Sequence, residues 1–285
     1  MNNKKIYSMW FLVPSLVIFS IFFLIPLVTS LFYSMTVWDF KTYTFVGLDN
    51  FKMFFSERSL NIGIKNTLIY AFLTSSMKVI IAFFLAVFLT SKIRTKNLLR
   101  SIVFFPNLVS TIAVGITFAA LMHPTKGLFN LVLHTLGFEK VDWLGNTSIA
   151  LFSVIFTDIW KGVGVATVIY IAGIQSIDKT YYEAASIDGA NGWRQLRDVT
   201  VPLVKPAMTS VIILSLIGGL RSFDLIWAMT GGGPGFATDV VASVVYKQYA
   251  AGYYGLSTAG NVIMFLLIAV IAFPLQKFLL SREEH

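Results

Sequence analysis

Residues 175–194 read Gln175-Ser-Ile-Asp-Lys-Thr-Tyr-Tyr-Glu183-Ala-Ala-Ser-Ile-Asp-Gly189-Ala-Asn-Gly-Trp-Arg194, and the polar stretch continues to Pro206. A long apolar run precedes this stretch and another follows it. Apolar runs of about 20 residues are long enough to cross the hydrocarbon core of a bilayer. The order apolar, polar, apolar therefore predicts two membrane spans joined by a folded loop outside the hydrocarbon. Such a loop is suited to contact a soluble partner.

Short-range signals predict a helix, a sharp turn and a second helix within this loop. Thr180 and Glu183 have the spacing of a capping box, which starts a helix. Gly189 can end that helix in a left-handed conformation. Asn191 can cap a second short helix, which we expect to end near the prolines at positions 202 and 206.

The composition is typical of a membrane protein with several spans. Hydrophobic residues make up 56% of the 285 residues and charged residues 13%, whereas soluble domains are about 45–50% apolar and about 25% charged. Six apolar runs can be drawn, at about 10–37, 66–90, 101–122, 148–173, 207–229 and 258–280. We therefore predict a single all-α integral membrane domain of six transmembrane helices.

The positive charges between the runs predict the orientation. The N-terminal segment, the loops 91–100 and 175–206, and the C-terminal end hold twelve Lys and Arg residues, and the opposite loops hold seven. An excess of Lys and Arg marks the cytoplasmic loops of membrane proteins. Topology thus accounts for the net charge of +8 without nucleic-acid binding. We expect a multi-pass protein of a bacterial-type cell membrane with both termini in the cytoplasm.

The loop also carries a recognisable motif. Glu183-Ala184-Ala185, with Gly189 six positions after Glu183 and Val199-Thr-Val-Pro202 beyond it, resembles the EAA loop of permease subunits of ATP-binding-cassette (ABC) importers. The usual ending Ile-x-Leu-Pro is Val-x-Val-Pro here. Ile187-Asp188-Gly189-Ala190, Trp193, Phe223-Asp224 and Thr230-Gly-Gly-Gly-Pro234 further resemble the carbohydrate-uptake subfamily, which includes maltose and glycerol-phosphate permeases. The resemblance extends from about Phe11 to the C-terminus.

This resemblance implies the type I permease fold and a set of partners. The chain would form half of the translocation pathway for a sugar, expected to be a di- or oligosaccharide. A second, homologous permease, expected to be a different chain, would form the other half, and two ATPase subunits would bind the loop. An extracytoplasmic solute-binding protein would deliver the sugar. ATP and magnesium would be bound by the ATPase, so this chain is predicted to be a transport subunit without a cofactor and not an enzyme.

The ATPase contact is expected on the two loop helices. The alanines after Glu183 are strong helix formers with little bulk, so another surface can approach the helix closely. The residues predicted to couple to the ATPase are Glu183, Ala184, Ala185, Asp188, Gly189, Trp193, Arg194 and Pro202.

Polar and aromatic residues within the spans are candidates for the pathway. Asp158 and Lys161 are three apart in the fourth run, and Arg221 and Asp224 are three apart in the fifth. Charges at membrane depth are costly unless they are paired or face water. Each pair therefore indicates an ion pair within one helix, side chains that extend to the membrane interface, or a hydrated pathway. Aromatic rings suit the apolar faces of sugars. The candidate pathway residues are Asp158, Trp160, Phe223, Asp224, Trp227 and Asn261, and Lys78 in the second run is not assigned.

The segment Gly231-Gly-Gly-Pro-Gly235 lies on the outer side in this topology. It has two interpretations. It can be a flexible turn between spans, or, by the resemblance, a contact site for a solute-binding protein.

Other activities lack their residues. No Gly-x-x-x-x-Gly-Lys-Ser/Thr loop is present, so ATP should be bound elsewhere. The chain has no cysteine, and His123, His134 and His285 show no metal-site spacing. The alternative function is a six-span channel or ion-driven carrier subunit that would use the charged residues of the fourth and fifth runs. This alternative leaves the long loop without a role.

Overall fold

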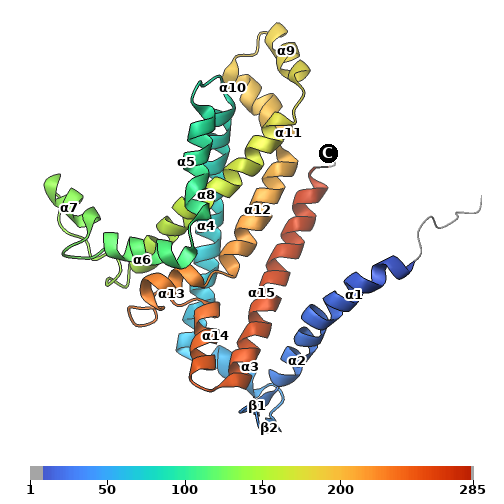
Figure 1. Ribbon diagram of the computed structural model, residues 1–285, viewed down its shortest axis with the longest axis vertical. Coiled ribbons are helices and arrows are strands. Elements are labelled where there is room, and N and C mark those ends of the chain that lie inside the picture. Colours follow the sequence, from blue (N-terminus) through green and yellow to red (C-terminus); the bar gives the residue numbers. More distant parts are fainter. Residues whose placement is uncertain (1–8, 284–285) are drawn as a thin grey trace, which may run out of the picture.

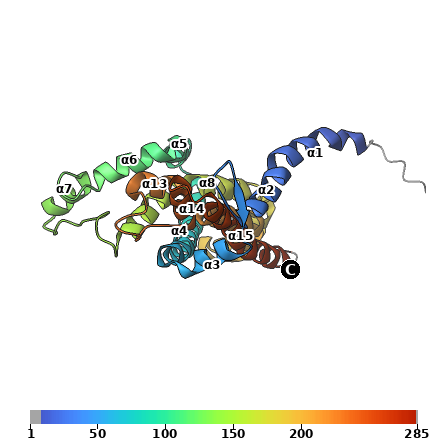
Figure 2. The same ribbon diagram turned by 90° about the horizontal axis from the view of Figure 1, so that it is seen from below.

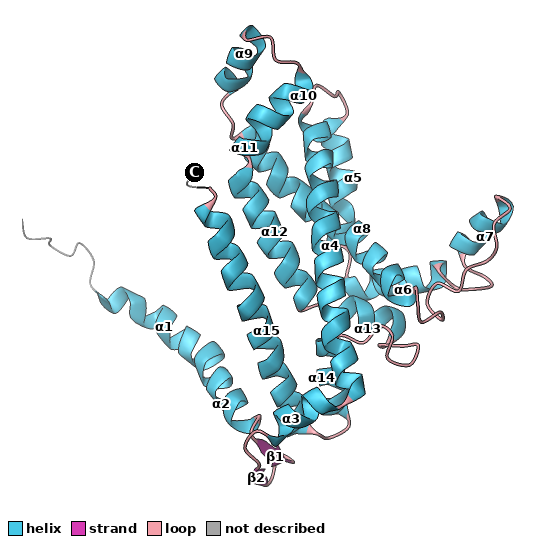
Figure 3. Cartoon of the chain, turned by 180° about the vertical axis from the view of Figure 1, so that it is seen from behind, coloured by secondary structure: helices cyan, strands magenta, loops and turns pink. Residues whose placement is uncertain are grey.

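The computed structural model describes residues 9–283, so Lys4, Lys5 and His285 lie outside the described residues. The described chain is helical apart from one short hairpin and the connecting loops (Figures 1 and 3). In chain order the elements are η1 (Met9–Leu12), α1 (Val13–Phe19), η2 (Ser20–Leu24), α2 (Ile25–Tyr33), β1 (Thr36–Trp38), β2 (Tyr43–Phe45), α3 (Asp49–Ser56), α4 (Arg58–Thr90), α5 (Lys96–Leu108), α6 (Thr111–Leu121), α7 (Leu128–Thr135), α8 (Ala150–Gln175), α9 (Lys179–Ile187), α10 (Gly192–Gln195), η3 (Leu196–Thr200), α11 (Val201–Leu203), α12 (Lys205–Leu220), α13 (Asp224–Thr230), α14 (Val241–Ala250) and α15 (Tyr254–Ser281).

The core lies where α4, α8 and α12 run beside one another (Figure 1). One cluster of buried apolar side chains includes Tyr70 of α4, and a second includes Tyr170 of α8. A third, which includes Phe54 of α3, lies at the end of the molecule that carries the hairpin. The first span leads away from this bundle, and no residue in the apolar window of Trp10–Tyr33 is buried (Figures 1 and 2).

The described residues contain four helices that are long and apolar enough to cross a membrane, or up to six spans if two bent pairs are each counted as one. In the first bent pair, α5 and α6 meet at 96°. The predicted span 101–122 is therefore broken at Val109, where the backbone is extended. In the second pair, Gly192–Leu203 meets α12 at 67°.

Two predicted spans end in the wrong place. The first span ends at Tyr33 and not at Val37, because strand β1 begins at Thr36. The fifth span was expected at 207–229, but α12 ends at Leu220 and a separate helix, α13, follows it. The backbone leaves helical values at Phe223, where φ is −140° and ψ is −58°. The apolar sequence conceals this break because hydropathy reports composition and not helix direction.

Candidate functional site

The first loop helix, α9, is capped by Asp178. Its carboxylate accepts hydrogen bonds from the Thr180 backbone N–H at 2.9 Å and from the Thr180 hydroxyl at 3.0 Å. These bonds lower the pKa of Asp178 below its usual value. The predicted capping box of Thr180 and Glu183 is therefore wrong, because the helix begins at Lys179 and places Thr180 in its first turn. Within the described chain the exposed Glu183 side chain has no hydrogen bond or ion pair, which leaves it available to another molecule.

Gly189 ends α9 as predicted. Its φ is +77°, in the left-handed region. The Gly189 N–H donates to the Ser186 carbonyl at 3.1 Å, and the Ala190 N–H donates to the Ala185 carbonyl at 2.8 Å. These two bonds form a Schellman motif, which satisfies the last carbonyl groups of the helix. The chain thereby reverses direction within three residues.

Asn191 caps the second loop helix, also as predicted, because its side-chain oxygen accepts the Arg194 N–H at 2.9 Å. Pro202 does not limit this helix. The helical segment runs through a π-turn, η3, and ends at Leu203 beyond the proline. The π-turn shifts the hydrogen bonds ahead of Pro202, and the break comes at Val204, before the helix that contains Pro206 in its first turn.

Side-chain hydrogen bonds hold the two loop helices together. The Gln195 amide donates to the Ser186 hydroxyl at 2.9 Å and to the Ala190 carbonyl at 3.2 Å. The Tyr182 and Thr200 hydroxyl groups are hydrogen-bonded at 3.0 Å. The loop is therefore a braced unit at one end of the molecule, beside the turn between α4 and α5 (Figure 1).

The braced loop presents apolar side chains to solvent. Ile187 is 86% exposed and Trp193 is 66% exposed. The other predicted coupling residues are exposed too, except Ala185, which is half-buried. Apolar groups rimmed by polar ones are typical of a surface that contacts another protein.

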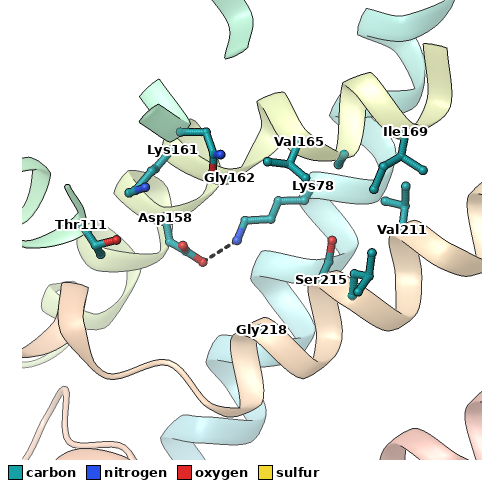
Figure 4. A pocket seen from close by; sticks show the side chains of 13 residues that line it. Lys78, Thr111, Asp158, Lys161, Gly162, Val165, Ile169, Val211, Ser215 and Gly218 are labelled. Atoms are coloured by element: carbon teal, nitrogen blue, oxygen red, sulfur yellow. Dashed lines mark hydrogen bonds and ion pairs between the residues drawn. The ribbon is translucent and has the colours of Figure 1, made fainter. Parts of the chain in front are cut away.

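Asp158 pairs with a charged residue of another helix, and not with Lys161 of its own helix. The Lys78 ammonium of α4 lies 2.7 Å from the Asp158 carboxylate of α8, and the two side chains are only 11% and 19% exposed (Figure 4). Lys161 forms no ion pair with Asp158 within the described chain. A Cβ at Gly162 would lie 2.6 Å from Cε of Lys78, so the glycine provides the space for this side chain. Sequence reasoning had left Lys78 unassigned.

Asp158 lies where two cavities meet. One, of about 260 Å³, is lined by Lys78, Asn107, Lys161 and Ser215 among others. The second, of about 600 Å³, is lined by Arg221, Phe223 and Asp224 among others. Thr111, Asp158, Leu214 and Gly218 line both cavities. We call the two cavities together the polar groove.

Phe223, which lines the polar groove, belongs to an aromatic cluster. The rings of Phe223 and Trp227 are stacked with centroids 5.7 Å apart, and Tyr246 of α14 packs edge-on against Trp227 at 4.7 Å. Asp224 and Trp227 share α13, whereas Arg221 precedes the break, so Arg221 and Asp224 do not share a helix. Sequence reasoning missed Tyr246, since its neighbours are distant in the chain.

Two predicted pathway residues lie elsewhere. Trp160 packs against Phe118 at 5.0 Å and does not line the groove. Asn261 of α15 lines a different cavity together with residues of η2 and α2, such as Phe22 and Pro26. Within residues 9–283 no three His, Cys, Asp or Glu side chains are grouped so that they could hold a metal ion.

Comparison with known proteins identifies this architecture. Residues 78–285 match the family described as "Binding-protein-dependent transport system inner membrane component". A trehalose/maltose transport system permease protein, MalF, of Thermococcus litoralis is 33% identical over 90% of this chain and 88% of its own length. The multiple sugar-binding transport system permease protein MsmF of Streptococcus mutans is 31% identical over 94% of this chain and 93% of its own length.

The fold is also that of a solved ABC importer. A bacterial ABC transporter involved in the import of the acidic polysaccharide alginate contains a chain that superposes with a TM-score of 0.82 and 24% identity. The match covers 95% of this chain and 94% of that chain. The predicted all-α type I permease fold is confirmed. The chain therefore belongs to the family of inner membrane components of binding-protein-dependent transport systems.

Proposed function

We propose that this chain is one permease subunit of an ABC importer for a di- or oligosaccharide. The observation that carries this proposal is the polar groove with stacked aromatic rings beside it, in a chain whose relatives are named as sugar permeases. Polar side chains in the groove can bond sugar hydroxyl groups, and the rings of Phe223 and Trp227 can pack on the apolar face of a sugar. A second permease would complete the pathway around the groove.

The braced loop is the proposed contact with the ATPase. Glu183 and Arg194 offer charges, and Trp193 offers an exposed ring, on a surface whose own backbone hydrogen bonds are satisfied. A rigid loop can transmit a displacement of the ATPase to α8 and α12, which leave its two ends. ATP hydrolysis is assigned to the ATPase chains, and this chain moves the sugar.

The same assignment sets the orientation in the membrane. The braced loop, the turn between α4 and α5, and the C-terminal end of α15 lie toward one end of the molecule (Figure 1), and the sequence places its excess of Lys and Arg in these segments. This end is proposed to be cytoplasmic.

Because the chain lacks cysteine, single introduced cysteines can test this orientation. Cysteines at the exposed positions Thr95 and Ser186 should react only from the cytoplasmic side, and one at Thr147 only from outside. External labelling at Ser186 would contradict the orientation.

Reconstitution tests the function itself. The chain is purified with the proteins that accompany it in its own membrane and placed in liposomes containing ATP. Uptake of radiolabelled maltose, trehalose and maltotriose is measured with and without an added solute-binding protein. We expect uptake that requires both ATP and the binding protein. Saturable uptake by this chain alone, driven by a proton or sodium gradient, would instead support an ion-driven carrier.

A further inference from the structure

A fully buried carboxylate lies behind the glycine-rich loop that joins α13 to α14. The Asp239 side chain is 0% exposed. Its two oxygens accept hydrogen bonds from the Lys247 ammonium at 2.9 and 2.8 Å, and the Ser243 hydroxyl donates to it at 2.8 Å. Burying a charge is costly unless it is paired and hydrogen-bonded, and these three contacts provide both. Asp239 therefore joins the end of the loop to two successive turns of α14.

The loop is closed over this carboxylate. A side chain at Gly232 would collide with Asp239, so only glycine lets the loop backbone lie there. The buried Thr238 hydroxyl is hydrogen-bonded to the Thr230 hydroxyl at 2.7 Å and to the Gly233 carbonyl at 2.8 Å. These bonds join both ends of the glycine-rich turn at residues 231–235.

The loop is also fixed to the long helix α4. The Asn66 amide donates to the Ala237 carbonyl at 3.0 Å and to the Asp239 carbonyl at 2.9 Å. The Thr67 hydroxyl accepts the Val241 N–H at 2.9 Å. Both side chains are buried. The start of α14 is consequently held by α4 as well as by its own loop.

Helix α14 also contacts the aromatic cluster beside the polar groove. Tyr246, the neighbour of Lys247 on α14, packs on the rings of Trp227 and Phe223 of the α13 segment. Helices α13 and α14 are therefore joined twice, by the aromatic cluster and by the glycine-rich loop with its Asp239 contacts. A displacement of the outer loop would move the groove residues of α13 with it.

We infer that Asp239 is a positioning residue that couples the outer surface of the protein to the polar groove. Through Lys247 and Gly232 it makes α13, the loop and α14 move as one body, so that a solute-binding protein seated on the loop also displaces Phe223, Asp224 and Trp227. The surface beside the loop suits such a partner, since the half-buried Gly233 and Pro234 line a hollow of about 510 Å³ together with His123 and Asp142. The choice of a solute-binding protein as the partner rests on the proposed importer function. The brace, by which we mean the contacts of Asp239 with Lys247, Ser243 and Gly232, rests on the structure alone.

The brace is tested first, without any partner. Spin labels are attached to cysteines at Phe236, exposed on the loop, and Glu57, exposed at the start of α4. The distance distribution between them is measured in the full chain purified from membranes. We expect a narrow distribution in the otherwise unmodified chain, a broad one in Asp239→Asn and Lys247→Met, and a narrow one again in Lys247→Arg. The matched control is Asp49→Asn, which removes an exposed ion pair with Lys52 on the same side. Equal widths in Asp239→Asn and the unmodified chain would overturn the inference.

Coupling is tested second, in the transporter assembled with its partners. The ATPase rate is measured against the concentration of a solute-binding protein that stimulates the unmodified transporter. We expect Asp239→Asn to raise the apparent KM for the binding protein about 5–150-fold, the usual range for coupled sites, and Lys247→Arg to restore it. A residue that only supports folding would lower the yield and leave this KM unchanged, which would overturn the coupling. If no binding protein stimulates even the unmodified transporter, the proposed function fails, and the distance measurement still decides the brace.

Discussion

The Lys78 ammonium on α4 lies 2.7 Å from the Asp158 carboxylate on α8, although the residues are 80 positions apart in the sequence. The pair is largely buried and joins two of the helices that are long and apolar enough to span a membrane. It also lines the polar groove. The ion pair therefore joins two of these helices at the groove that we propose as part of the sugar pathway.

Removing one member of this pair should destabilise the protein more than removing both. Asp158→Leu leaves the Lys78 charge without a partner, which typically costs about 3–5 kcal/mol in a buried site. The double variant Lys78→Met with Asp158→Leu has no buried charge, so its free energy of unfolding should lie close to that of the unmodified protein. The coupling between the two side chains is measured by thermal unfolding in detergent of the unmodified protein, Lys78→Met, Asp158→Leu and the double variant. Additive losses in the double variant would show that the two side chains do not stabilise each other.

Sequence reasoning succeeded where neighbours in the chain decide the structure. Gly189 and Asn191 act on backbone groups within five residues, so their turn and cap could be predicted from residue type. The capping box predicted for α9 is wrong because Asp178, two positions before Thr180, caps the helix instead. The apolar runs located most of the spans because burial in lipid needs length and composition alone.

The groove could not be predicted in the same way, because it depends on which helix faces meet. Asp158 was expected to pair within its own helix, to extend to the membrane interface or to line a pathway, and no local signal connects it to Lys78. Arg221 and Asp224 were expected on one helix because the apolar run continues across the break between them. Tyr246 belonged to a predicted outer segment, and its contact with Trp227 arises only when α14 folds back on α13.

The aromatic cluster should determine sugar transport more than assembly. Trp227→Ala removes a ring that packs on Tyr246 and on Phe223, which lines the groove. Losing the proposed contact of this ring with the sugar, worth about 0.5–1.5 kcal/mol, should weaken the apparent affinity for sugar about two- to tenfold. Trp160→Ala is the matched control, since Trp160 packs on Phe118 and not on Phe223, the ring that lines the groove. Concentration-dependent uptake in proteoliposomes gives both values, and equal effects of the two substitutions would exclude Trp227 from the pathway.

Asp178 and Glu183 should have separable effects on the braced loop. Asp178→Ala removes the cap of α9 and should speed amide hydrogen exchange in its first turn, whereas Glu183→Ala should leave exchange unchanged and weaken only the ATPase contact. Because folding lowers the pKa of Asp178, the cap stabilises the helix above the usual carboxyl pKa and is lost as the pH falls through the lowered value. Amide exchange in the unmodified protein and in Asp178→Ala should therefore become equal in strong acid. Faster exchange in Glu183→Ala at neutral pH would restore a capping role to Glu183.

Gly189 provides the most specific test of the loop as the coupling element. Its φ is +77°, and no atom lies within 4 Å of the position that a Cβ would take, so a substitution there changes only the backbone energy. Holding an L-residue in the left-handed region costs about 1–2 kcal/mol. That amount is too small to unfold the membrane helices. The substitution should instead change the orientation of α9 relative to α10.

The matched variant is Gly192→Ala in the same loop. Gly192 also has open space around it, but its backbone is not in the left-handed region and it begins α10, where alanine is the better helix former. We expect Gly189→Ala to weaken ATPase binding about 5–30-fold, which corresponds to about 1–2 kcal/mol, and Gly192→Ala to leave it unchanged. The dissociation constant is measured by titrating the purified ATPase onto equal amounts of each permease in nanodiscs. Because both variants keep the surface chemistry of the loop, a difference between them can only come from the turn at Gly189. Identical dissociation constants would mean that this turn does not orient the ATPase contact.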